Sequence, residues 1–344
     1  MPPSELSKVV SRFRAALLAQ DAATAQLLID SYGNIYLRLS SEIDAILEIA
    51  ARRELTIGQV KRLERFQALQ AQVLSEMHRY SAFAGETITI GQRSASGLAQ
   101  GHVQALVDTA LPPGINRGVL ARAGIVWNTL PADAFEMFIG IAGDGSPLAR
   151  LLDTIGPEAR VGMTEAIGQG ISQGLGPRRT AALVRDRLGM GLTRSLAFAR
   201  TETLRAYRES SRLQYASNPN VVKGYRRHCE RGPRTCMACI ALDGKFYETE
   251  VPLNEHVNGR CAMVPETVSY KDLGLSTEDR RPQDPDAREW FKEQPRLIQR
   301  SMMGPSKFEV WEAGDIQLED LAKVEQNPIW GEQAVVTPLK DLVG

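Results

Sequence analysis

The chain has 344 residues, of which 43% are hydrophobic and 24% charged, so it can bury a sizeable core and has an ordinary globular composition. This composition excludes a collagen-like protein, a disordered chain and a disulfide scaffold, and no apolar run is long enough to cross a membrane. The N-terminus lacks the layout of a secretory signal, so we expect synthesis in a cytoplasm, where the four cysteines would be thiols or metal ligands.

The net charge of zero hides an uneven distribution of charge along the chain. Residues 178–234 carry 14 Lys or Arg against 4 Asp or Glu, whereas residues 243–344 carry 12 against 20. A basic segment of this kind indicates either contact with nucleic-acid phosphates or a solvated helix face that pairs with the acidic tail. The segment has no aromatic stacking pattern and no groove-reading motif, so the second interpretation is favoured, and any affinity for DNA should be weak and indifferent to sequence.

Residues 1–150 are predicted to form an N-terminal helical bundle or a set of extended helices that bind a partner. Apolar residues of the segment Leu39–Ile49 recur at helical spacing. Ser40 and Ser41 are good N-cap residue types and are expected to open this helix. Such stripes are typical of core or partner-helix faces.

A second helix is predicted from the capping box that Thr56 and Gln59 can form. Its apolar residues recur in steps of three and four over residues 60–80. Helix breakers cluster at residues 112–114 and 142–147, which places a domain boundary near the second of these segments.

A third helical series follows, with one helix over residues 177–188 that is expected to end at Gly189 and a longer one over residues 193–215. Arg200 and Glu202 lie two apart in the longer helix and cannot share a face, so each needs its own partner. We expect a buried salt bridge here that locks this helix onto the strand-containing part of the chain.

After this helix the pattern changes to short strands separated by turn residues. Asp243 and Gly244 form a strong two-residue turn signal, which predicts a β-hairpin between strand residues at 240–242 and 246–247. The tail is predicted to return to short amphipathic helices around Trp290, Ile298, Phe308–Trp311 and Leu318–Val324. The predicted fold class is therefore mainly α with a small α+β module toward the C-terminus.

All four cysteines lie close together in the sequence. Cys236 and Cys239 form a C-x-x-C, and His256 and Cys261 follow the predicted hairpin, an arrangement typical of small zinc sites. The predicted ligands are Cys236, Cys239, His256 and Cys261, with Cys229 able to replace His256. Four protein ligands leave no position for water, so such a zinc site would be structural.

Three other interpretations compete with zinc. The thiols can be unmetallated and simply packed, since free cysteine behaves as a small buried hydrophobe. A thioredoxin-like pair would open a helix within a βαβ unit, which the sequence does not show. A metal-dependent nuclease of the treble-clef kind is suggested by Glu255, His256 and Asn258, but no histidine follows His256 to complete its site. Zinc and packed thiols stay open, and no catalytic residue is predicted.

Five short segments also carry a resemblance to a known family, namely Ala199–Thr203, Val222–Tyr225, Arg234–Cys239, Leu242–Lys245 and His256–Cys261. They resemble the phage Mu F-like domain of phage minor head, or head morphogenesis, proteins. That family ends its core in a pattern like H-P-N-C-R-C. Here Val257 replaces the proline and Gly259 the first cysteine, which excludes a ligand at position 259. The tail is similar to tails that follow this domain, at Glu289–Phe291, Met303–Phe308 and Trp311–Ile316.

The resemblance covers about residues 150–344. It implies a Mu F-like domain over residues 151–270 and a C-terminal tail over residues 271–344. It implies a virion component present in few copies near the portal, acting in head assembly and in DNA packaging or ejection, with no established catalytic activity. Its partners would be the portal protein or the inner capsid shell, and packaged double-stranded DNA, with no membrane. A zinc-dependent nuclease or delivered toxin and a non-specific DNA-binding module are the alternatives.

Overall fold

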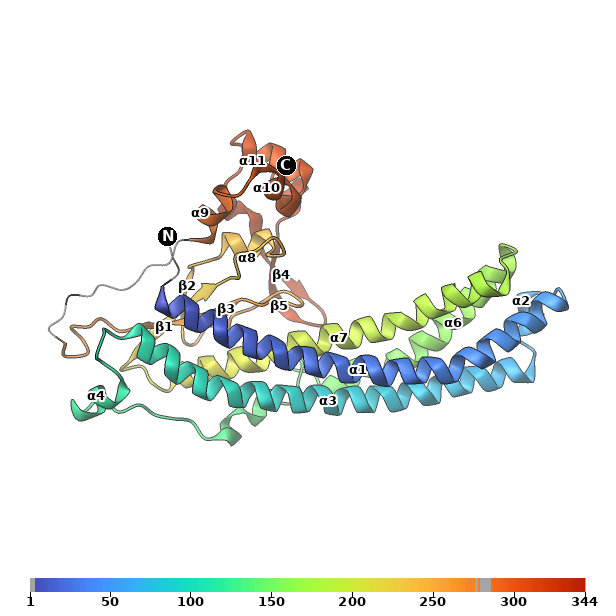
Figure 1. Ribbon diagram of the computed structural model, residues 1–344, viewed down its shortest axis with the longest axis horizontal. Helices are drawn as coiled ribbons and strands as arrows, with labels where there is room; N and C mark the ends of the chain where they lie inside the picture. The colour runs from blue at the N-terminus through green and yellow to red at the C-terminus, as the bar shows by residue number, and fades with distance from the viewer. Residues whose placement is uncertain (1–3, 276–277, 279–285, 344) are drawn as a thin grey trace. The chain divides into compact units, whose positions relative to one another are not determined.

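The computed structural model describes residues 4–275, 278 and 286–343 of the chain. The chain is mainly helical, with a small antiparallel β module in its C-terminal part (Figure 1), so the predicted fold class is confirmed. Among the described residues, no helix is long and apolar enough to span a membrane.

The helices, in chain order, are α1 (Glu5–Arg52), α2 (Ile57–Val60), α3 (Glu64–Ala110), α4 (Arg117–Arg122), α5 (Leu148–Leu152), α6 (Ile155–Ser172), α7 (Pro177–Ala216), α8 (Met237–Ala241), α9 (Ala287–Lys292), α10 (Arg296–Met303) and α11 (Pro305–Glu312). Short 3-10 helices are η1 (Ala132–Phe138), η2 (Leu318–Leu321) and η3 (Leu339–Asp341). The strands are β1 (Val222–His228), β2 (Phe246–Glu248), β3 (Ala262–Thr267), β4 (Ala322–Asn327) and β5 (Gly331–Val336).

The chain forms two compact units. The first, here called the helical unit, consists of Gln20–Gly91 and Gly140–Thr203. The second, here called the mixed unit, consists of Met1–Ala19, Gln92–Ile139 and Leu204–Gly344. Helices α1, α3 and α7 each contribute residues to both units, so these units divide the chain differently from the boundaries expected near residues 150 and 270. Those boundaries stay predictions about the family domain.

In the helical unit, α1 is buried along one stripe. The stripe follows helical spacing and consists of Leu28, Tyr32, Ile35, Leu39, Ile43 and Ile46. The prediction that Ser40 and Ser41 open a helix is wrong, because both lie inside α1. The Ser40 hydroxyl donates to the Leu37 carbonyl instead, which lets a serine sit in a helix interior without capping it.

The capping box of Thr56 and Gln59 is confirmed. The Thr56 hydroxyl oxygen accepts from the Gln59 backbone N–H at 3.4 Å, and the Gln59 side-chain oxygen accepts from the Thr56 N–H at 2.8 Å. The helix that it opens, α2, ends at Val60, and α3 begins at Glu64. The long apolar stripe predicted over residues 60–80 therefore lies mostly on α3.

The predicted helix end at Gly189 is wrong, because α7 continues through it to Ala216. The second glycine of this stretch, Gly191, serves close packing. A Cβ there would lie 2.8 Å from Ile155 Cγ2, and the Tyr32 hydroxyl, which donates to the Leu188 carbonyl, lies beside it. Gly191 thus permits the close approach of helices, a use that a helix-end signal does not reveal.

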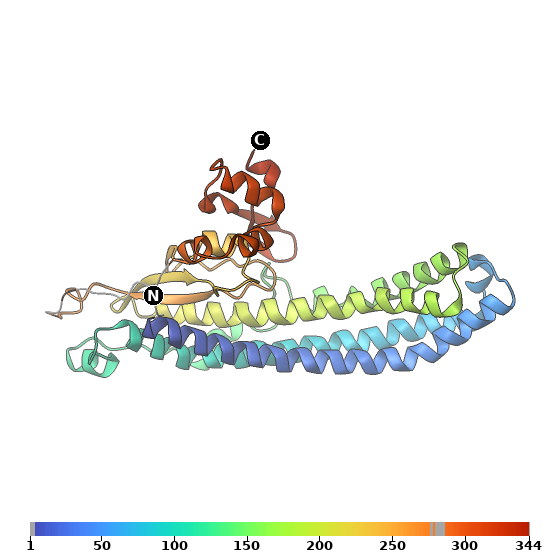
Figure 2. The same cartoon turned by 45° about the horizontal axis from the view of Figure 1, so that its top comes forward.

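In the mixed unit, β2, β1 and β3 form a three-stranded antiparallel sheet in that order. Tyr225 of β1 lies opposite Tyr247 of β2 and Pro265 of β3. Helix α8 lies between this sheet and the tail helices (Figures 1 and 2). One hydrophobic core joins these elements, with side chains such as Val107, Tyr225, Ile240, Phe291 and Phe308.

The predicted hairpin around Asp243 and Gly244 is wrong. Residues 237–241 form α8, and β2 pairs with β1, which lies earlier in the chain. Gly244 adopts the positive φ that the turn signal predicts, but the turn ends a helix and leads into β2. The Cys236 cap and the buried Ile240 favour a helix over the local hairpin signal.

The tail contains the expected helices α9, α10 and α11. The helix expected at Leu318–Val324 is wrong beyond Leu321, because η2 gives way there to a hairpin of β4 and β5. This hairpin and η2 pack on α8, and tertiary contact of this kind overrides a short amphipathic pattern.

Candidate metal centre

The C-x-x-C motif lies at the start of α8. Cys236 is the N-cap residue of this helix, and its Sγ accepts from the Cys239 backbone N–H at 3.4 Å. Cys239 is buried in the first turn of the helix. Because residues three apart lie on one side of a helical turn, both thiols point to the same place.

His256 comes from the segment between β2 and β3. Its Nε2 lies 3.3 Å from Cys236 Sγ and 3.4 Å from Cys239 Sγ. Its other ring nitrogen, Nδ1, lies 2.9 Å from the Val257 carbonyl oxygen, which can only accept and so assigns the ring proton to Nδ1. Nε2 then faces the two thiols, and once its proton is displaced its lone pair can bind a metal ion, the arrangement that histidine ligands of metals adopt.

Cys261, immediately before β3, completes the group. Ligand atoms of Cys236, Cys239 and His256 lie within 4.8 Å of one another, and so do those of Cys239, Glu255 and Cys261. Cys239 belongs to both triads. Through Cys239, the two triads bring together the four predicted residues Cys236, Cys239, His256 and Cys261, here called the Cys/His cluster, which could hold a metal ion.

The two sulfur–nitrogen distances to His256 suit a tetrahedral site. A zinc ion bound at usual lengths to a thiolate and an imidazole would separate the sulfur and the nitrogen by about 3.6 Å. The two distances from His256 Nε2, 3.3 and 3.4 Å, are within a few tenths of an ångström of that value. Binding an ion would therefore require only a small expansion of this part of the cluster.

Hydrogen bonds within the cluster set its protonation. The bond to Cys239 raises the pKa of His256 to about 9, against the opposing effect of burial. The bond with Cys239 lowers the pKa of Cys236, whereas the bond with Cys239 and burial raise the pKa of Cys261 well above its usual range. A metal ion would displace these protons, so its affinity would rise with pH.

Sequence reasoning missed a buried ion pair beside the cluster. Arg227 of β1 and Glu255 contact each other, and their side chains are 1% and 0% exposed. Arg227 also donates to Cys239 Sγ at 3.5 Å, and the Glu255 carboxylate lies 4.0 Å from the same sulfur. The signal that could have found Arg227 is its place in β1, where the sheet's alternation points it inward.

Gly259 packs closely against Glu255 and His256. A Cβ at this position would lie 2.1 Å from Glu255 Oε2 and 2.8 Å from the His256 carbonyl oxygen. The Glu255 carboxylate thus fills the space that a cysteine side chain at position 259 would need. Any side chain at position 259 would therefore have to displace the carboxylate that pairs with Arg227.

Asp243 ties three segments of the mixed unit together. Its carboxylate accepts from the backbone N–H of Cys229 at 2.7 Å and from that of Ala287 at 3.0 Å, and it lies 3.6 Å from the Arg231 guanidinium. Cys229 is buried there and belongs to neither triad among the described residues. Its predicted use in place of His256 finds no support.

Arg200 and Glu202 make separate contacts, as their spacing predicts. Arg200 pairs with Asp21 of α1 at 2.7 Å, and the buried Glu202 accepts from the Gly143 backbone N–H at 3.0 Å. Both contacts lie within the helical unit. The prediction that these residues lock α7 onto the strands is therefore wrong, because their partners come from other parts of the helical unit.

Comparison of the chain with family models, with curated proteins and with solved structures found no match.

Proposed function

We propose that the chain is a phage minor head protein with a Mu F-like domain, a structural virion component near the portal that acts in head morphogenesis. The observation that carries this proposal is the Cys/His cluster. Its members, Cys236, Cys239, His256 and Cys261, belong to two of the segments that resemble the family, and the fold brings the two segments together. Segments matched only by chance would have no reason to meet at one site.

The cluster, in this proposal, holds one structural zinc ion. Cys236 and Cys239 would bind it from α8, His256 from the segment before β3, and Cys261 from the start of β3. The ion would supply cross-linking, because four protein ligands leave it no open position for a substrate. The ion would join α8 to the strand β3. The short three-stranded sheet alone would hold these two elements together only weakly.

The proposed partners are the portal protein or the inner capsid shell, with packaged double-stranded DNA as a non-specific contact. Support for a protein partner comes from exposed apolar side chains on the long helices, such as Leu27 and Leu37 on α1 and Ile90 on α3. Contiguous exposed apolar side chains mark protein interfaces, so the proposal expects these residues to belong to the surface that a partner covers.

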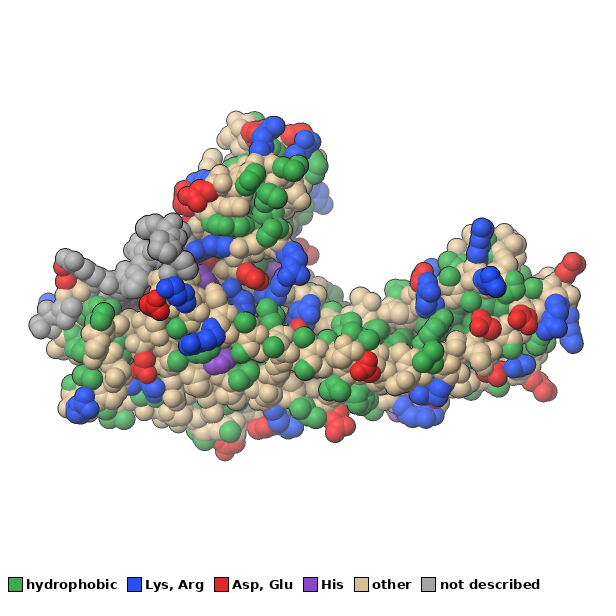
Figure 3. Space-filling view, in the orientation of Figure 1, with side chains coloured by type: hydrophobic (Ala, Val, Ile, Leu, Met, Phe, Trp, Pro, Cys, Tyr) green, Lys and Arg blue, Asp and Glu red, His purple; other side chains and the backbone are tan. Residues whose placement is uncertain are grey.

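The DNA-binding alternative has less support, because much of the basic segment is engaged in ion pairs. These pairs include Arg194–Glu158, Arg200–Asp21, Arg212–Glu209, Arg226–Glu266, Arg227–Glu255 and Arg231–Asp243. On the face that Figure 3 shows, Lys and Arg side chains are scattered among acidic and apolar ones. Any DNA contact is then expected to weaken steeply with salt.

The nuclease or toxin alternative also gains nothing from the geometry. Glu255, its candidate acid or base, is fully buried and paired with Arg227. A carboxylate in that position has no access to a substrate phosphate. We therefore keep the structural role as the proposal.

Two measurements test the proposal. Elemental analysis of the purified chain should find about one zinc per chain, and Cys236→Ser should remove most of it. In heads assembled with the Cys236→Ser protein, incorporation should fall because the mixed unit is loosened. A protein without zinc would remove the metal from the proposal, and undiminished incorporation into heads that lack the portal would remove the portal partner.

A further inference from the structure

Four charged side chains are buried in the described part of the mixed unit, namely Arg208, Arg227, Asp243 and Glu255. Asp243 belongs to neither triad, and its carboxylate is balanced by the Arg231 guanidinium at 3.6 Å. The other three lie beside the Cys/His cluster and comprise two guanidinium groups and one carboxylate. Apart from the cluster's own residues, the buried side chains here therefore carry one positive charge in excess, which is costly unless an anion offsets it.

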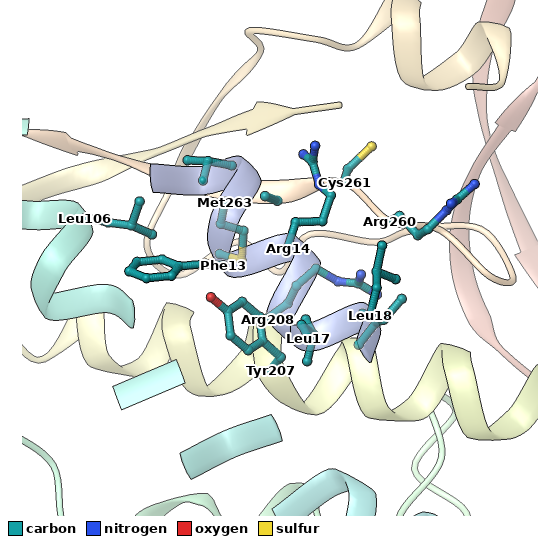
Figure 4. A pocket seen from close by; sticks show the side chains of 13 residues that line it. Phe13, Arg14, Leu17, Leu18, Leu106, Tyr207, Arg208, Arg260, Cys261 and Met263 are labelled. Atoms are coloured by element: carbon teal, nitrogen blue, oxygen red, sulfur yellow. The ribbon is translucent and has the colours of Figure 1, made fainter. Parts of the chain in front are cut away.

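Arg208 reaches the cluster from α7. Its Nη1 donates to the Gly259 carbonyl at 3.2 Å, within the segment that carries His256 and Cys261. The Arg208 and Cys261 side chains line one pocket of the mixed unit (Figure 4). Burial lowers the pKa of the Arg208 guanidinium, and the charges of Glu255 and then Cys261 oppose this effect. Arg208 is thus fixed against the ligand segment and interacts electrostatically with the site.

The carboxylates near Arg208 are also engaged by other arginines. Glu255 contacts Arg227, and Glu209, the next residue along α7, pairs with Arg212 at 2.9 Å. Arg208 Nε is buried without a hydrogen-bond partner among the described residues. Carboxylates of the protein therefore offset the charge of Arg208 only in part.

The metal-loaded cluster has the charge that would complete this balance. Three thiolates, one neutral imidazole and a divalent ion together carry one net negative charge. Arg227 already donates to Cys239 Sγ at 3.5 Å, so one of the two guanidinium groups contacts a ligand atom directly. The remaining positive charge of the buried centre equals, with opposite sign, the charge of the loaded cluster.

We propose that Arg208 is a positioning residue of the metal site, whose charge offsets the three zinc-bound thiolates and so raises the affinity for zinc. This role rests on the proposed zinc ion. It requires no access of a ligand to the guanidinium, because the effect acts through the charge alone. Partners that support metal ligands from outside the coordination sphere typically change metal affinity 10–100-fold.

Zinc affinity of the purified full chain, measured by competition with a chelator, tests the proposal. Arg208→Gln keeps a hydrogen-bond donor for the Gly259 carbonyl but removes the charge, and it should weaken zinc binding about 10–100-fold. Arg208→Lys keeps a point charge and should stay within about threefold of the wild type. This rescue separates the charge of Arg208 from its packing and its hydrogen bond.

Arg212→Gln is the matched control on the same helix. Arg212 Nη1 also donates to a backbone carbonyl, that of Thr249 at 3.0 Å, but Glu209 balances its charge. Its loss should leave zinc affinity unchanged. Cobalt(II) in place of zinc gives a spectroscopic readout, because thiolate-to-cobalt charge-transfer absorption reports the thiolate ligands. At saturating cobalt, Arg208→Gln should show the same absorption as the wild type, since the ligands themselves are intact.

Four results would overturn the role of Arg208. Equal zinc affinity of Arg208→Gln and the wild type would remove it and leave the zinc ion in place. A loss in Arg208→Lys as large as in Arg208→Gln would assign the effect to the contact with Gly259, and this variant decides the matter if Arg208→Gln does not fold. A weaker cobalt absorption at saturation would mean that Arg208 shapes the ligand set. A wild type that binds no zinc would overturn the ion itself, and this role with it.

Discussion

The helical unit and the mixed unit are stabilised in different ways. In the helical unit, long apolar stripes such as that of α1 are buried at regular helical spacing, so its core is continuous and repetitive. In the mixed unit, short elements surround buried polar groups: the Arg227–Glu255 pair, Arg208 and the Cys/His cluster. A stripe tolerates the loss of one side chain as a local defect, whereas a polar centre depends on each of its partners.

The largest expected effect comes from breaking the cluster. Cys239→Ser removes the residue that both triads share, and with a metal bound it should cost several kcal/mol of mixed-unit stability. Hydrogen exchange should then accelerate across α8, β2 and β3 and stay slow in α1 from Gln20 to Arg52. Chelation of the wild type should reproduce the pattern. Equal acceleration in both units would mean that the cluster does not stabilise the mixed unit separately from the helical unit.

Removing one member of the buried ion pair should cost about 3–5 kcal/mol, because it leaves the other charge buried and unpaired. Arg227→Met is the variant, and denaturant unfolding followed by exchange in the sheet is the measurement. Arg226→Met is the matched control: its side chain is 52% exposed, and its partner Glu266 also pairs with Lys223, so its loss should cost at most about 1 kcal/mol.

The double variant Arg227→Met with Glu255→Gln sharpens this test. Removing both charges should recover part of the loss, since the penalty comes mainly from the orphaned carboxylate. If the double variant loses more unfolding free energy than the two single variants lose together, the pair does not act as a charge-compensated unit.

In the helical unit, Leu39→Ala should cost roughly 2–5 kcal/mol by leaving a cavity in the stripe. The control is Leu37→Ala on the same helix, where the side chain is 68% exposed, and it should change stability by less than about 0.5 kcal/mol. Zinc content should be unaffected by either change. A loss of zinc in Leu39→Ala would show that the two units do not respond separately.

The smallest effects separate two glycines of α7. Gly191→Ala should destabilise the helical unit by about 1–3 kcal/mol, because its Cβ would meet Ile155 at 2.8 Å. Gly189→Ala should stabilise it by up to about 1 kcal/mol, because nothing lies within 4 Å of a Cβ there and alanine favours the helix. Thermal melting of both variants checks the opposite signs.

The candidate site was predictable to the extent that its ligands follow local spacing. The C-x-x-C and the His256–Cys261 segment indicate a metal cluster from the sequence, and the fold brings these residues together. The ion pair that surrounds them was not predictable, because Glu255 and Arg227 come from different strand-flanking segments. Only strand pairing decides that an arginine in β1 points toward a carboxylate after β2.

The amino-acid sequence by itself determined the helical character of the chain, the Thr56–Gln59 capping box and the set of candidate ligands. These features rest on interactions between residues a few positions apart, which periodicity and capping preferences encode. Tertiary structure decided where the helices continue and what the turns connect. Helix α7 continues through Gly189 to Ala216. Asp243 and Gly244 end a helix because β2 pairs with β1, and β4 and β5 form a hairpin that packs on α8. In each case contacts between distant residues outweighed a local preference of about 1 kcal/mol.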